Sequence, residues 1–137
     1  MATYLLIRHA KAERPPDVAD IERQLAERGE RDATLIGAFL ATAIPAPGRV
    51  VTSPARRARR TAEIIATAAG WSAPIEVEDR LYGGSIGDLL AELADSDDEV
   101  VAAFGHEPVW SGAAATLMGG GVINLVTAAV VCLEGTP

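Results

Sequence analysis

The stretch Thr3-Tyr4-Leu5-Leu6-Ile7 decides the fold of this chain, because it is a continuous β-prone apolar run that ends abruptly at Arg8-His9. Such a run is typical of a strand that is buried on both faces of a parallel sheet. Residues 49–52 and 99–104 repeat the pattern further along the chain. Shorter or later runs at 74–77 and 127–133 predict two more strands.

Helical patterns separate these predicted strands. Apolar residues recur at helical spacing from Leu35 to Ile44, and Pro45 ends that pattern. Ser53-Pro54 predicts the start of a second helix, since Ser caps free N–H groups and Pro suits the first helical position. Further helices are predicted over 86–93 and 109–118. The alternation predicts an α/β fold, a three-layer α/β/α sandwich with a mainly parallel central sheet.

Composition narrows the class of protein. With 137 residues and 49% hydrophobic content, the chain is the size of one domain, which we expect to span residues 1–137. Its net charge of -7 argues against nucleic acid or an anionic membrane as a partner. The opening run is too short for a signal peptide and no window is long enough to span a membrane, so we expect a cytoplasmic protein. The single cysteine, Cys132, lies in an apolar run, and we expect it to be buried.

Polar side chains directly follow three of the predicted strands. These are Arg8-His9, the segment from Ser53 to Arg57, and Gly105-His106-Glu107-Pro108. In open α/β sheets, ligands bind beyond the carboxyl ends of the strands, so these segments can converge on one site. The only two histidines of the chain both lie there.

A group of two imidazoles and two guanidiniums suits a phosphoryl group. Its spread negative charge favours the planar, forked donors of Arg8 and Arg57 and the positive end of a helix dipole. Arg57 falls in the first turn of the predicted second helix, where free backbone N–H groups face the same anion. The sequence therefore predicts a phosphate pocket at this edge of the sheet.

These residues resemble the histidine phosphatase (phosphoglycerate mutase-like) superfamily, whose hallmark is a strand that ends in Arg-His-Gly. Here Ala10 takes the third position, as in the small phosphohistidine phosphatase (SixA-like) branch. Further segments are similar to that branch in the same order along the chain: Ile21 to Gly29, Ser53-Pro54-Ala55-Arg56-Arg57-Ala58-x-x-Thr61, Leu81-Tyr82, Gly105-His106-x-Pro108 and Thr127-x-Ala129.

The resemblance implies a phosphoglycerate mutase-like fold and a phosphatase that acts through a phosphohistidine intermediate on His9. Arg8, Arg57 and His106 would hold the three non-bridging oxygens, with no metal and no cofactor. A neutral imidazole is a good nucleophile near pH 7, which agrees with this role. The implied substrate is a protein phosphohistidine. A phosphatase of small phosphomonoesters and a non-catalytic phosphate-binding module are the alternatives.

Several residues have two interpretations. Arg23 lies in a matched segment and either reaches the substrate phosphate or forms a structural ion pair. Glu107 is a possible general acid, or it simply favours the start of a helix through the dipole. Lys11 and Tyr82 either line the rim of the site or have only a surface or core role. Other arginines of the second helix are interpreted as a solvated face: Arg56, Arg59 and Arg60.

Overall fold

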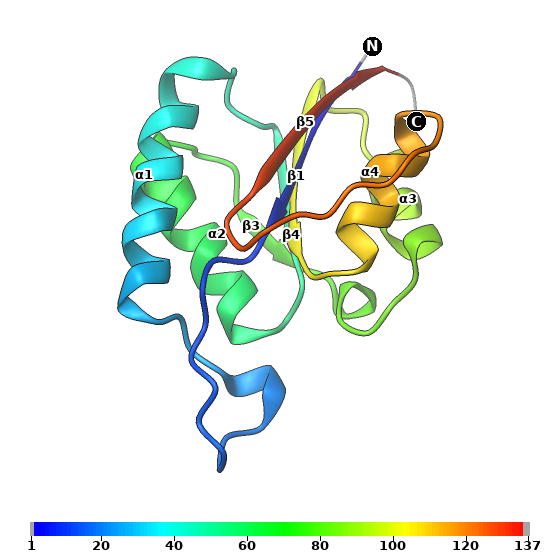
Figure 1. Ribbon diagram of the computed structural model, residues 1–137. Helices are drawn as coiled ribbons and strands as arrows, with labels where there is room; N and C mark the ends of the chain where they lie inside the picture. The colour runs from blue at the N-terminus through cyan, green and yellow to red at the C-terminus, as the bar shows by residue number, and fades with distance from the viewer. Residues whose placement is uncertain (1, 136–137) are drawn as a thin grey trace.

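A central sheet organises the computed structural model, which describes residues 2–135 (Figure 1). Its strands are β1 (Ala2–Arg8), β2 (Arg49–Thr52), β3 (Ile75–Val77), β4 (Val100–Gly105) and β5 (Val130–Gly135). The helices are α1 (Glu27–Ala43), α2 (Arg56–Ala69), α3 (Ile86–Ala94) and α4 (Val109–Leu117), with short 3-10 turns η1 (Asp20–Glu22) and η2 (Asp79–Leu81). The strand order is β3-β2-β4-β1-β5, and β5 alone in this sheet is antiparallel to its neighbour.

The helices cover both faces of the sheet, with α1 and α2 on one side and α3 and α4 on the other (Figure 1). Alternate residues of β1 point to opposite sides. Leu5 and Ile7 pack in the cluster beneath α1 and α2, whereas Tyr4 and Leu6 pack in the cluster beneath α3 and α4. This explains why the run is apolar without alternation, and it confirms the three-layer α/β/α sandwich with a mainly parallel sheet.

The first helix begins earlier than its apolar pattern indicates and buries a different face. Gly37 and Leu40 are buried, whereas Leu35 and Phe39 are 69% and 66% exposed. A Cβ at Gly37 would lie 2.6 Å from the Cβ of Ala68 in α2, so the two helices approach too closely for large side chains between them. Small residues therefore form the contact that the apolar spacing alone does not locate.

The predicted cap of the second helix is wrong. Helix α2 begins at Arg56 and its N-cap is Ala55, with no side-chain cap. The hydroxyl of Ser53 accepts a hydrogen bond from the backbone N–H of Ala55 at 3.1 Å and also meets the ring of His106. Ser53 is thus engaged in the turn before the helix, which delays the first helical residue.

The predicted burial of Cys132 is also wrong, because its side chain is exposed. Residue 132 lies on β5, which pairs only with β1 and forms the edge of the sheet. The strand itself covers residues 130–135 rather than 127–133. An apolar run predicts burial only where a layer covers both faces, and the edge strand lacks such cover at this residue.

The register of the sheet aligns the ends of three neighbouring strands. Strand β4 lies between β1 and β2, with Arg8 paired to Gly105 and Thr52 paired to Phe104. The residues that follow these strands therefore emerge side by side at the carboxyl edge. Among residues 2–135, no helix has the length and apolar character that crossing a membrane requires.

Candidate active site

The two histidines of the chain meet at the carboxyl edge of the sheet. Their ring centroids are 5.2 Å apart and the ring planes are inclined by 53°. His9 follows β1 and its backbone N–H donates to the carbonyl of Gly105 at 3.0 Å, while His106 directly follows β4. The structure thus brings together the two rings that the sequence places 97 positions apart, 9 and 106.

The proton of the neutral His9 ring is fixed by its backbone. Its Nδ1 lies 2.8 Å from the carbonyl oxygen of Ala10, which can only accept, so Nδ1 carries the hydrogen and Nε2 keeps a free lone pair. Burial lowers the pKa of His9 to about 4, against the Ala10 hydrogen bond and with help from the nearby arginines. The ring is therefore neutral near pH 7, in the state that a nitrogen nucleophile requires.

Thr61 ties the segment after His9 to helix α2. Its hydroxyl donates to the carbonyl of Arg57 at 2.7 Å and accepts from the N–H of Ala10 at 3.0 Å. All three residues are buried. The hydroxyl therefore fixes the backbone of the His9 loop against the helix turn that carries Arg57.

The ring of His106 is held between two partners. Its Nδ1 faces Nη2 of Arg57 at 3.5 Å, and a guanidinium can only donate, so this nitrogen holds the lone pair. Nε2 then donates to the hydroxyl of Ser53 at 2.7 Å. Burial lowers the pKa of His106 to about 3, with further lowering from His9 and Arg57 and an opposing effect of Asp20. Both imidazoles are therefore neutral beside the guanidiniums.

Two buried guanidinium nitrogens of the site have no partner. Among residues 2–135, Nε of Arg8 and Nε of Arg57 are the buried side-chain N or O atoms without a hydrogen bond. Terminal nitrogens of both groups are engaged, Arg8 by the carbonyl of Leu125 at 2.9 Å and Arg57 by Asp20. A buried N–H without an acceptor costs about 1–3 kcal/mol, and an oxyanion between these donors would remove that cost.

Asp20 links the arginines, and the sequence interpretation missed it. Its carboxylate accepts from Arg57 and from Arg23 at 3.0 Å each, and from the hydroxyl of Tyr82 at 2.7 Å. Its backbone carbonyl also accepts from Arg57 at 2.7 Å. These contacts hold the pKa of Asp20 well below its usual range, with the Tyr82 hydrogen bond as the largest cause. The spacing of Asp20 and Arg23 is the only signal in the sequence, and it is a weak one.

The remaining candidates have mixed positions. Arg23 forms the ion pair with Asp20, as one of its two interpretations predicts, and it lies close enough to lower the pKa of His9, while its contact with a substrate phosphate stays a prediction. The ring of Tyr82 stands edge-on to His106, with centroids 5.7 Å apart. The carboxylate of Glu107 accepts from the backbone N–H of Ser111 at 2.9 Å and from its hydroxyl, at the start of α4. Lys11 is exposed.

A metal site requires several His, Cys, Asp or Glu side chains around one point. Within the described residues, no group of three or more His, Cys, Asp or Glu side chains is placed to hold a metal ion. The groups that the site does present are two neutral imidazoles and the guanidiniums of Arg8, Arg23 and Arg57. Such a set can accept a phosphoryl group on one ring nitrogen and hold the oxygens of the group with N–H donors.

Comparison with known proteins places this geometry in a family. The family model described as the histidine phosphatase superfamily (branch 1) matches residues 4–116, which run from β1 into α4. An uncharacterised protein of Mycobacterium leprae (strain TN) is 40% identical in an alignment of 124 positions that covers 86% of this chain and 74% of that protein.

Solved structures agree with this match. A structure provisionally assigned as the phosphohistidine phosphatase SixA from Nakamurella multipartitia has a TM-score of 0.76 and 37% identity, and covers 85% of this chain. This chain spans 65% of that protein. A protein histidine phosphatase SixA complexed with tungstate has a TM-score of 0.88 at 23% identity, over 98% of this chain and 88% of its own, which shows the shared fold. The chain therefore belongs to branch 1 of the histidine phosphatase superfamily and is SixA-like.

Proposed function

We propose that this chain is a phosphatase that moves the phosphoryl group of a protein phosphohistidine first to Nε2 of His9 and then to water. The observation that carries this proposal is the buried, neutral His9, whose proton is held on Nδ1 by the Ala10 carbonyl 2.8 Å away. Such a ring presents a lone pair on Nε2 without first losing a proton. It does so beside two buried guanidinium N–H groups that lack an acceptor.

In the first step, Nε2 of His9 forms a bond to phosphorus while the bond from phosphorus to the substrate imidazole breaks. The leaving imidazole nitrogen takes up a proton from solvent, and the positive charge on the phosphorylated His9 ring is stabilised by the transferred phosphoryl oxygens. In the second step, a water oxygen bonds to phosphorus, the bond to Nε2 breaks, and inorganic phosphate leaves with a proton released to solvent. One displacement is thus divided into two easier ones.

The oxygens of the transferring group would be held by the free N–H groups of Arg8 and Arg57, and His106 would join them as the third partner by turning its Nε2–H from the Ser53 hydroxyl to a phosphoryl oxygen. The charge on these oxygens spreads during transfer, and fixed donors in a buried site stabilise it without reorganisation. His106 is placed against the Arg57 guanidinium and the Ser53 hydroxyl, so its ring orientation is defined before substrate binds.

Asp20 acts in this scheme as a positioning residue. It holds the two terminal nitrogens of Arg57 through its carbonyl and its carboxylate, which leaves the Nε–H of Arg57 free for a phosphoryl oxygen. The same carboxylate fixes Arg23 and the hydroxyl of Tyr82. A guanidinium that is oriented before binding loses less conformational entropy when the substrate arrives.

Glu107 stays a predicted general acid. Because its carboxylate is hydrogen bonded to Ser111, it needs a rearrangement to reach a leaving group. An alkoxide leaving group needs a proton more than an imidazole does. We therefore expect Glu107→Gln to lower the rate on a phosphomonoester more than the rate on a phosphohistidine, and equal losses on both would argue against the acid role.

Two observations support a phosphoprotein as the substrate. The solved relative at 37% identity is provisionally assigned as a phosphohistidine phosphatase. In addition, the elements beside the site are the short turns η1 and η2 and the segment before β5, whose Leu125 binds Arg8, and Asp20 at the edge remains 54% exposed. An opening of this kind admits a side chain that projects from another protein.

Radiolabel trapping tests the function. The protein is incubated with a phosphohistidine peptide labelled with ³²P and quenched in alkali, in which phosphohistidine is stable. We expect label on the wild-type chain and none on His9→Ala. Arg31→Ala is the matched control, since Arg31 is exposed on α1, and it should label as the wild type does.

Steady-state rates on the peptide and on a panel of sugar and nucleotide phosphates complete the test. A large preference for the sugar and nucleotide phosphates would show that the substrate is a small phosphomonoester. The proposed mechanism through His9 would then still apply. A wild-type protein that binds inorganic phosphate but gives neither label nor turnover on any substrate would instead be a phosphate-binding module.

A further inference from the structure

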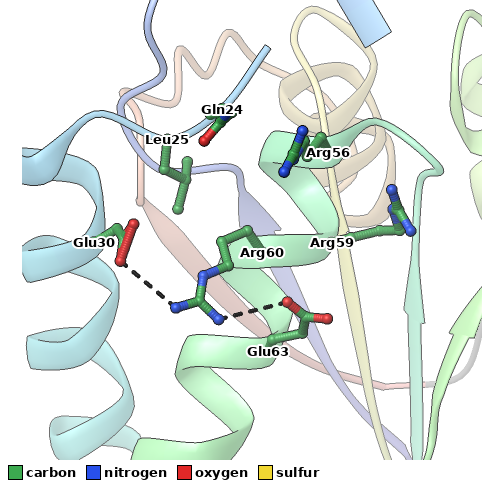
Figure 2. A pocket seen from close by; sticks show the side chains of 7 residues that line it. All are labelled: Gln24, Leu25, Glu30, Arg56, Arg59, Arg60 and Glu63. Atoms are coloured by element: carbon green, nitrogen blue, oxygen red, sulfur yellow. Dashed lines mark ion pairs between the residues drawn. The ribbon is translucent and has the colours of Figure 1, made fainter. Parts of the chain in front are cut away.

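A polar pocket opens between α1, α2 and the segment that leads into α1 (Figure 2). Its volume is about 290 Å³. Seven residues line it: Gln24, Leu25, Glu30, Arg56, Arg59, Arg60 and Glu63. Three of them are arginines from consecutive turns of one helix, which sets this pocket apart from its surroundings on an acidic protein.

The three arginines differ in their partners. Arg60 lies between Glu30 and Glu63, at 3.6 Å from each, as Figure 2 shows. Arg56 and Arg59 are exposed, and within residues 2–135 neither forms an ion pair. Arg60 thus engages both carboxylates of the pocket, the guanidiniums of Arg56 and Arg59 remain free to contact a partner, and the five charged residues of the lining sum to +1.

Two residues that line the pocket are neighbours in sequence of two residues of the candidate active site. Gln24 directly follows Arg23, and Arg56 directly precedes Arg57. The side chains of Arg23 and Arg57 both bind Asp20 beside the two histidines. Successive helix residues point about 100° apart, so the exposed Arg56 projects from the outer side of the turn that carries the buried Arg57, and a group bound by Arg56 lies outside the site at its border. A substrate that places a phosphoryl group in the site would place its neighbouring residues over this pocket.

The distribution of charge on the protein indicates the charge of the partner that this pocket binds. The whole chain carries a net charge of -7, yet Arg8, Arg23 and Arg57 gather at the site and two unpaired arginines adjoin them. An acidic partner is repelled by most of the surface and attracted to this face, which favours a productive orientation on encounter.

The spacing of the free arginines indicates the form of the partner. Arg56 and Arg59 are three positions apart on a helix, which separates their Cβ atoms by about 5–6 Å and lets them act as two distinct donors. Both are exposed and lack the buried support that a tight site for one tetrahedral anion needs. Two separate carboxylates on a protein surface fit this arrangement better than a second phosphate.

We propose that this pocket is a docking site for acidic residues that flank the phosphohistidine of a phosphoprotein substrate, recognised by Arg56 and Arg59. This inference rests on the proposed function, because it names the kind of phosphoprotein that the same site accepts. The contact is exposed and electrostatic, so it contributes to KM rather than to the chemical step and weakens with salt.

Two phosphohistidine peptides of equal length test the proposal, one with Glu and one with Gln on both sides of the phosphohistidine. For the wild type at low salt we expect kcat/KM to be about tenfold higher for the Glu peptide, mainly through KM, from two exposed ion pairs. The ratio should fall toward one in the double variant Arg56→Gln with Arg59→Gln, and it should also fall at 0.5 M salt. Arg31→Gln, with the same charge change on α1, should keep the ratio.

Binding of the unphosphorylated Glu peptide, followed by fluorescence anisotropy, separates this proposal from the proposed function. A protein that turns over the Gln peptide but shows no preference and no anisotropy change with the Glu peptide would overturn the docking site alone. Loss of all turnover with retained, Arg56- and Arg59-dependent binding would overturn the phosphatase and keep the docking site. A third outcome is that a small bisphosphate inhibits more strongly than inorganic phosphate does, that the double variant loses this difference, and that neither peptide is preferred. This outcome would show that the pocket binds a small molecule instead of an acidic protein.

Discussion

Asp20→Asn removes the one carboxylate that joins the guanidiniums of the site. In the native chain that carboxylate accepts from Arg57, Arg23 and Tyr82 at 3.0, 3.0 and 2.7 Å. Asparagine keeps the shape and one carbonyl oxygen but loses the charge and the second acceptor. The backbone carbonyl of residue 20 still accepts from Arg57, so the guanidinium is loosened rather than released.

The expected loss follows from these contacts. A hydrogen bond to a charged group contributes about 1.5–3 kcal/mol when it is buried. The Asp20 side chain is 54% exposed, so solvent screening places its two arginine contacts near or below the lower end of that range. We expect a net loss of about 1.5 kcal/mol in transition-state stabilisation, which is roughly a tenfold fall in kcat/KM.

Steady-state hydrolysis of phosphoramidate, a small substrate that makes no use of protein docking, measures the effect. The loss should appear in kcat, whereas KM should stay or fall, because a negative charge next to an anionic substrate has been removed. Asp17→Asn is the matched control from the same exposed segment. Thermal unfolding of both variants shows whether a loss of rate reflects a loss of structure, and Asp20→Glu shows whether a carboxylate on a longer side chain restores the rate.

Either of two results would refute the positioning role. If Asp20→Asn raises kcat/KM and tightens inhibition by inorganic phosphate, the carboxylate competes with the substrate for Arg57 instead of orienting it. A variant that keeps wild-type kcat and KM would show that Arg57 and Arg23 are oriented without it.

Four further predictions concern pH and stability. Because the pKa of His9 is lowered to about 4, kcat/KM should be flat through pH 6.5 and fall only as pH approaches 4, and a break near 6.5 in the rate profile would contradict this. In the unfolded chain, His9 takes up a proton near the ordinary histidine pKa of about 6.5. Protonation of His9 should therefore lower the free energy of unfolding by up to about 3 kcal/mol as pH falls from 6.5 to 4. Urea unfolding at several pH values measures this change. Gly105→Ala should lower the free energy of unfolding by about 1–3 kcal/mol, because a Cβ at residue 105 overlaps the Trp110 ring. Gly87→Ala in α3 has space for its Cβ and should raise the free energy of unfolding by about 0.5 kcal/mol. Equal melting temperatures for the two variants would exclude the clash. Glu92 is 3% exposed and binds two arginines at 2.7 and 2.6 Å, so Glu92→Gln should cost about 3 kcal/mol in urea unfolding, and a loss below about 1 kcal/mol would show that the ion pairs do not depend on its charge.

Much of the fold was predictable because its signals are local. Strand β1 is buried on both faces, so its apolar residues run without interruption, and the predicted boundaries of β2 agree with the structure. The prediction failed where a distant element decides the outcome. Cys132 is exposed because its strand lies at an edge, and the buried face of α1 is set by the close approach of α2 at Gly37.

The candidate site divides in the same way. The sequence indicated His9, Arg8, Arg57 and His106, because each directly follows a strand or begins a helix at one edge of the sheet. It assigned Ser53 to a helix cap, whereas its hydroxyl holds His106. Asp20 was not found at all, because its partners at 57 and 82 are remote in the chain.

By itself, the sequence determined which elements form and which side chains stand at the strand ends, since these depend on apolar patterns and on neighbours within a few residues. Only the tertiary structure decided the proton position on each imidazole, the lowered pKa values and the anchoring of Arg57 by Asp20. These properties depend on burial and on hydrogen bonds between segments far apart in the chain, which exist only after the strands have aligned their ends.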